Sequence, residues 1–95
     1  MSKFSARYTP ECSRVIAKLS TEIKRLVRSS IDTLLDKPNI GTELTGDLDG
    51  CYSYRVRRYR IIYRVNDDES SIDVYYVSHR RDVYETLRSL VSRKN

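Results

Sequence analysis

The stretch CYSYRVRRYRIIYRV, residues 51–65, decides how this chain folds. Apolar and aromatic residues alternate with polar residues in two runs, formed by Tyr52, Tyr54 and Val56 and then by Tyr59, Ile61, Tyr63 and Val65. A period of two is the pattern of a half-buried strand. Arg57 and Arg58 separate the two runs, so we predict two antiparallel strands that reverse tightly at these residues.

The same stretch holds five arginines and no acidic residue. Residues 1–50 carry eight Lys or Arg against seven Asp or Glu, whereas residues 51–95 carry ten against six. Most of the net charge of +5 therefore belongs to the second half of the chain. A patch of this density indicates a polyanion ligand, with an acidic protein partner as the competing explanation.

Strand alternation predicts where the arginines of this stretch lie. Ser53, Arg55 and Arg57 are expected on one side of the first strand, with Arg60 and Arg64 joining them across the hairpin. Like charges that face each other cost stability, so the cluster suggests that a ligand supplies negative charge. The alternative is a solvated surface whose arginines pair with acidic residues of the chain, namely Asp47, Asp49 or Asp73.

The rest of the chain is predicted to form one strand before a pair of helices and one strand at a later point in the sequence. Residues 3–8 alternate as a strand, Thr9 and Pro10 suit the start of a helix, and Ser20 or Thr21 suits the start of a second, strongly amphipathic helix that ends before Pro38. Residues 41–50 are predicted to be a loop, residues 66–71 a turn and residues 72–78 the last strand.

Asp82 could cap a short terminal helix. We therefore predict an α+β fold for residues 1–95 as a single domain. In this fold an N-terminal helical hairpin packs on one face of a small antiparallel-rich sheet, and a short helix ends the chain.

Several function classes are disfavoured by composition. No apolar run approaches the roughly 18 residues that cross a bilayer, and the N-terminus lacks the apolar core of a signal peptide, so a cytoplasmic protein without membrane attachment is expected. Cys12 and Cys51 have no CxxC spacing, and His79 is the only histidine. We therefore predict no metal site and no cofactor, with both cysteines as packing residues.

The second candidate cluster is SHRRDVYETL, residues 78–87. Arg80 and Tyr84 are four residues apart and would share one side of a helix. Such residues suit RNA phosphodiester cleavage, in which a 2′-hydroxyl attacks the neighbouring phosphate. The reaction needs a proton acceptor, a proton donor and cations that stabilise the phosphorane. Nearby arginines would favour the phenolate of a tyrosine and make it a better base. The structural alternative has Tyr84 packing at the base of the terminal helix.

At these residues the sequence resembles the RelE/ParE superfamily of type II toxins. The resemblance covers essentially the whole chain, and its most specific part is a pattern of glycine, tyrosine and basic residues matched by Gly50, Tyr52, Arg55, Tyr59, Arg60 and Tyr63. Two positions depart from this pattern. Ser53 stands where cleaving members often have Lys or Arg, and Arg57 stands where many members have the glycine of the hairpin turn.

The resemblance to the RelE branch implies roles for single residues. Arg55 and Arg60 would bind and stabilise the phosphate, and Arg80 would act as acid or charge stabiliser. Tyr84 would be the candidate base, with His79 as a second candidate for proton transfer. The catalytic set implied is thus Arg60, His79, Arg80 and Tyr84, and the set that binds RNA phosphate is Arg55, Arg57, Arg58, Arg64 and Arg81.

The function implied by the resemblance is ribosome-dependent cleavage of mRNA in the A site, which inhibits translation. The expected partners are the ribosome, mRNA and a RelB-like cognate antitoxin with an acidic or amphipathic segment. Two alternatives remain open: a ParE-like inhibitor of DNA gyrase, and a toxin-like binding domain that has lost activity, for which Ser53 is the main argument.

Overall fold

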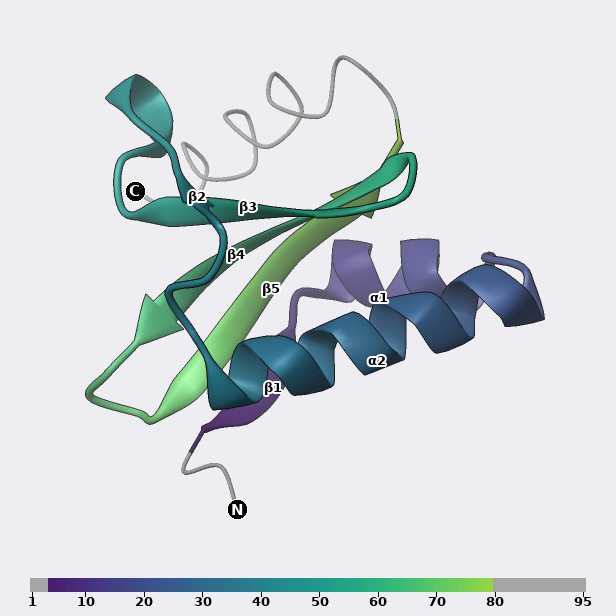
Figure 1. The fold of residues 1–95 in the computed structure, drawn as a ribbon, viewed down its shortest axis with the longest axis horizontal. Helices are drawn as coiled ribbons and strands as arrows, with labels where there is room; N and C mark the ends of the chain where they lie inside the picture. The colour runs from purple at the N-terminus through teal and green to yellow at the C-terminus, as the bar shows by residue number, and fades with distance from the viewer. Residues whose placement is uncertain (1–3, 80–95) are drawn as a thin grey trace.

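The computed structural model describes residues 4–79, which form one mixed sheet with two helices on one side (Figure 1). In chain order the elements are β1 (Ser5–Tyr8), α1 (Pro10–Ala17), α2 (Thr21–Asp36), β2 (Thr42–Glu43), the 3-10 turn η1 (Gly46–Leu48), β3 (Cys51–Val56), β4 (Tyr59–Asn66) and β5 (Ser71–Ser78). The strand order across the sheet is β1-β5-β4-β3-β2. The terminal helix predicted after Asp82 lies outside the described residues.

Both helices begin where the capping residues predict. The Thr9 hydroxyl accepts a hydrogen bond from the Cys12 amide at 3.1 Å, and the Ser20 hydroxyl accepts one from the Ile23 amide at 3.3 Å. Thr9 also donates to the carbonyl of Tyr75 at 3.0 Å, which ties the start of α1 to β5. Neither described helix is long and apolar enough to span a bilayer.

The main core lies between the helices and one face of the sheet, which confirms the α+β class. Both layers contribute fully or almost fully buried side chains: Cys12, Val27, Ile31 and Leu34 from the helices, and Ile61, Tyr63, Ile72, Val74 and Val77 from the strands. Tyr63 anchors the exit of α2 as well. Its hydroxyl donates to the Pro38 carbonyl at 2.8 Å and accepts from the Gly41 amide at 3.1 Å. The hairpin sequence therefore forms the centre of the fold.

Two features of the sheet differ from the sequence prediction or go beyond it. Residues 41–50, predicted as a loop, contain the short strand β2, in which Thr42 pairs with Ser53 and Glu43 with Tyr52, and then η1. This segment covers a second apolar cluster on the sheet face away from the helices, made of Leu48, Cys51 and Ile62 with Leu44, Tyr75 and Tyr76. Cys12 and Cys51 are both buried free thiols, which confirms their packing role.

The first strand pairs with the last. Ser5 lies opposite Ser71 and Tyr8 opposite Val74 in a parallel ladder, whereas β4 pairs with both β3 and β5 in antiparallel fashion. A parallel pair needs a crossover, and here the whole of α1, α2 and the β3–β4 hairpin separates the two strands. The hairpin strands consequently occupy the middle of the sheet.

Candidate functional site

The sheet face away from α1 and α2, here called the open face, carries two of the predicted arginines side by side. In the β3–β4 ladder Arg55 lies directly opposite Arg60, and in the β4–β5 ladder Arg60 lies opposite Ser78. Tyr54, Val56 and Ile61, which alternate with these arginines, pack on the helix side. We call Arg55, Arg60 and Ser78 the basic row. The expectation that Arg55 and Arg60 meet across the hairpin is confirmed.

The basic row suits an anion. Arg55 is exposed, and its Nε donates to the Arg57 carbonyl at 3.2 Å, which leaves the rest of the guanidinium facing solvent. Arg60 is partly buried. Two like charges directly opposite one another are unfavourable, and a phosphate held between them converts that repulsion into attraction. Guanidinium groups offer paired N–H donors that match phosphate oxygens.

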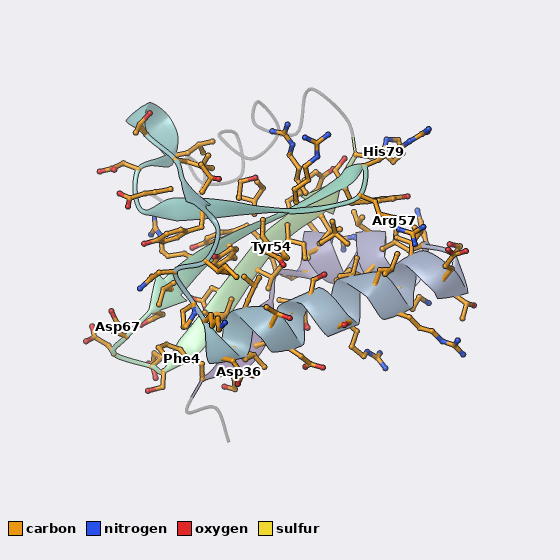
Figure 2. All side chains as sticks on the ribbon, viewed as in Figure 1. Phe4, Asp36, Tyr54, Arg57, Asp67 and His79 are labelled. Atoms are coloured by element: carbon orange, nitrogen blue, oxygen red, sulfur yellow. The ribbon has the colours of Figure 1, made fainter. Side chains whose placement is uncertain are left out.

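Arg57 does not share this face, so the expectation that it joins Arg55 there is wrong. It occupies the two-residue turn with a left-handed φ of 56°, which takes it out of the strand alternation. Its Nη1 pairs instead with the Glu22 carboxylate of α2 at 3.4 Å. Figure 2 shows Arg57 on the side of the helices. Arg58, the other turn residue, is exposed.

Arg64 lies on the open face but near the opposite end of β4, about 13 Å along the strand from Arg60 at 3.3 Å per residue. Its Nη2 donates to the Asp49 carbonyl at 3.4 Å, and its Nε is buried without a hydrogen-bond partner. Gly50, with φ of 90°, packs against the guanidinium, and a Cβ there would lie 3.5 Å from Nη2, which is an ordinary van der Waals contact. Arg64 therefore holds the loop before β3.

The sequence suggested three aspartates as partners of the hairpin arginines, and the structure shows other contacts for two of them. Asp73, which lies opposite Arg64 in the ladder, pairs with Arg7 of β1 at 3.1 Å and accepts from Ser71 at 2.7 Å. Burial alone would raise the pKa of Asp73, but hydrogen bonds from Ser71, Arg7 and Asn66 outweigh it, so the pKa is lowered. Asp49 presents its carbonyl to Arg64. Nothing is described of the Asp47 side chain.

His79 follows β5 at the same end of the sheet as the basic row. It is exposed, and its ring stands edge-on to Tyr59 with centroids 5.1 Å apart and planes at 85°. Tyr59 packs against the main core on the helix side, so His79 lies toward that side rather than over Arg60. Figure 2 shows His79 and Arg57 close to this end. The predicted Arg80, Arg81 and Tyr84 lie outside the described residues.

The described tyrosines show how burial and nearby arginines compete. Burial raises the pKa of Tyr63, and it also raises the pKa of Tyr75, where the neighbouring Arg64 lowers it less. Cys51 follows the same rule, because burial raises the pKa of its thiol against the opposing effect of Arg64. At these two side chains, Tyr75 and Cys51, burial therefore outweighs the neighbouring arginine.

Sequence reasoning missed the tertiary partners of two arginines. Glu22 and Arg57 are 35 residues apart, and Arg7 and Asp73 are 66 apart, so no local pattern links them. Within residues 4–79 no group of three or more His, Cys, Asp or Glu side chains is placed to hold a metal ion.

Comparison with known proteins identifies the family of this chain. A family model described as the ParE toxin of the type II toxin-antitoxin system, parDE, matches residues 6–84. The chain therefore belongs to the RelE/ParE superfamily and is a toxin of a type II toxin-antitoxin system.

One curated relative and two solved structures show how similar the chain is to individual members of the family. Toxin RelG of Mycobacterium tuberculosis is 30% identical over 83 residues, which are 85% of this chain and 95% of RelG. The toxin-antitoxin complex RelBE2 of the same organism has a chain with 29% identity and a TM-score of 0.72, covering 80% of this chain and 96% of that chain. A mutant of the E. coli toxin RelE in the free state shares the fold, with a TM-score of 0.78 at 21% identity over 99% of this chain and 98% of that chain.

Proposed function

We propose that this toxin cleaves mRNA on the ribosome and thereby inhibits translation. The observation that carries the proposal is the basic row, because Arg55 and Arg60 stand opposite each other on an open sheet face, where a phosphodiester can lie between them. The 30% identity with Toxin RelG supports the choice of the RelE branch. The fold leaves this face uncovered by α1 and α2 (Figure 1).

The reaction proposed needs no nucleophile from the protein. The 2′-hydroxyl loses its proton and attacks the adjacent phosphorus, and the 5′ oxygen leaves and takes up a proton. Arg55 and Arg60 hold the phosphate and stabilise the negative charge that develops on it. Arg80 supplies a further cation or the proton for the leaving oxygen, and Tyr84 accepts the 2′ proton, with His79 as the other candidate.

A cognate antitoxin is the expected regulator. Solved complexes pair RelE with RelB in E. coli and in Pyrococcus horikoshii, and the RelBE2 complex is likewise a toxin-antitoxin pair. We infer that this chain has a RelB-like partner with an acidic or amphipathic segment, and that both act in the cytoplasm. An acidic segment complements the positive charge of the β3–β4 hairpin.

Inhibition of DNA gyrase is the second candidate, because the matching family model is that of the ParE toxin. This function requires binding and no proton transfer. A toxin-like domain without activity is the third candidate, and it rests on Ser53, which lies on β3 opposite Ile62 and adds no cation to the open face.

One experiment separates the three candidates. The purified toxin is added to cell-free translation, mRNA ends are mapped with and without ribosomes, and supercoiling by gyrase is measured in parallel. Cuts that depend on ribosomes and disappear with Arg80→Ala and Tyr84→Phe support the proposed cleavage. Intact mRNA with blocked supercoiling identifies a gyrase inhibitor, and no effect in either assay identifies an inactive domain.

A further inference from the structure

The second helix is more basic in its first half than in its second. Lys24, Arg25 and Arg28 share the half that begins beside the β3–β4 turn with one carboxylate, Glu22, whereas Asp32 and Asp36 belong to the far half. The helix dipole favours the opposite arrangement, since it disfavours a carboxylate in the last turn, where Asp36 stands. Figure 2 shows Asp36 and Arg57 at opposite ends of the helix. Of the three cations in the first half, Arg25 lies beside the hairpin turn, and Lys24 and Arg28 lie toward α1.

A cleft of about 590 Å³ lies between the start of α2 and the hairpin turn. Arg25 and Arg57 line it together with the hydroxyl residues Thr21 and Ser29, and the partly buried Leu26 adds an apolar side. Two guanidinium groups with hydroxyls beside them are the donors that bind nucleic-acid phosphates. The cleft thus offers two guanidinium groups to a phosphate and a largely apolar lining to the attached nucleotide.

Glu22 also lines the cleft and holds Arg57 at 3.4 Å. The side chains of Arg57 and Glu22 are 63% and 73% exposed, so water screens the pair and its stabilising effect is small. A phosphate that enters the cleft can replace the carboxylate as the partner of Arg57. Glu22 and a bound phosphate would therefore compete for Arg57.

The hairpin turn links the basic row to the cleft. Arg55 donates through its Nε to the Arg57 carbonyl, and Arg57 pairs with Glu22 on the other side of the sheet. We propose that the cleft is a second binding surface for the RNA backbone, so that one single strand passes from the open face around the hairpin turn onto α2. A nucleic-acid strand fits this course because its charge is continuous. The inference rests on the proposed function only for the choice of RNA as ligand.

The test measures binding without cleavage. The probe is a short fluorescein-labelled RNA with 2′-O-methyl groups, which cannot be cut, and fluorescence anisotropy is recorded over a range of salt concentrations. The double variant Arg25→Gln with Arg57→Gln is compared with Arg14→Gln with Lys37→Gln, which removes the same charge from residues outside the cleft. At 0.1 M salt we expect the first variant to bind about tenfold more weakly, and its salt slope to shrink by about 1.4, the value for two contacts to a single strand.

A charge-matched pair tests the role of Glu22. Glu22→Gln and Asp36→Asn each remove one exposed carboxylate from α2. We expect Glu22→Gln to bind the probe about threefold more tightly because it releases Arg57, and Asp36→Asn to bind as the unmodified protein does. Equal effects of the two substitutions contradict the proposal, because long-range charge alone then explains the change.

The outcomes also separate this inference from the proposed function. If the Arg25 and Arg57 double variant binds RNA like its control but binds the cognate antitoxin more weakly, the cleft is a protein-binding surface and the proposal is wrong. If ribosome-dependent cleavage is absent but probe binding depends on these residues, the inference stands alone. Thermal melting of every variant verifies that the fold is retained.

Discussion

Arg60 and Arg64 lie four residues apart on one strand and point to the same face, yet the structure gives them different surroundings. Arg60 stands between Arg55 and Ser78, where like charges face each other. Arg64 lies beneath Gly50, donates to the Asp49 carbonyl and has a buried Nε. The residue type and the face of the sheet are the same in both cases. What differs is the surroundings, because the loop before β3 packs against Arg64 and is held by it.

The largest effect is expected at Arg60. Arg60→Gln removes a cation from the basic row, and the rate of mRNA cleavage should fall about 100- to 1,000-fold because one donor to the developing charge is lost. Single-turnover cleavage on programmed ribosomes measures it. Thermal melting of the variant verifies that the fold is retained. A variant that cuts at the normal rate contradicts the assignment of Arg60.

Arg64→Ala should act on stability instead. It removes the donor to the Asp49 carbonyl and the contact of the guanidinium with Gly50, so we expect a loss of about 2 kcal/mol in the free energy of unfolding. Urea denaturation measures this loss, and Arg58→Ala, at an exposed turn position, is the control. The pKa of the Cys51 thiol should rise further, because Arg64 lowers it at present. Unchanged stability together with weakened RNA binding would contradict the structural role assigned to Arg64.

Asp73 lies opposite Arg64 in the β4–β5 ladder, and we expect it to contribute to stability as Arg64 does. Because its folded pKa lies below the ordinary value of 3.8, its contribution is complete above that value and is lost as the pH falls through the folded pKa. Asp73→Asn should cost about 1 kcal/mol at neutral pH and should flatten the decline of stability in acid. Denaturant unfolding from pH 7 down to pH 2 gives both quantities. An unchanged acid profile shows that the carboxylate is not linked to folding.

The smallest effect on stability is expected at Arg57 in the β3–β4 turn. Arg57→Gly relieves the cost of a left-handed φ and loses the exposed pair with Glu22, and the two changes oppose each other. The net change in unfolding free energy should stay within about 0.5 kcal/mol. RNA binding should weaken all the same, which anisotropy detects. A clear gain in stability shows that the ion pair contributes nothing.

The sequence was informative wherever the signal is local. Alternation predicted β3 and β4, Thr9 and Ser20 predicted the helix starts, and the facing of Arg55 and Arg60 followed from the register of a two-residue turn. Alternation assigns a side chain to a face but does not say what lies over it. For that reason two contacts could not be predicted: the hydrogen bond from Arg64 to the Asp49 carbonyl and the ion pair of Arg57 with Glu22. Both depend on contacts between segments that are distant in the sequence.

The parallel ladder between the first and last described strands has a consequence for the timing of folding. Arg7 and Asp73 are 66 residues apart, so β1 cannot find its partner in the sheet until β5 has been synthesised. Contacts of such long range slow folding, and synthesis at about 5–20 residues per second adds a delay of seconds. A nascent toxin therefore cannot complete its sheet until β5 has emerged from the ribosome that makes it.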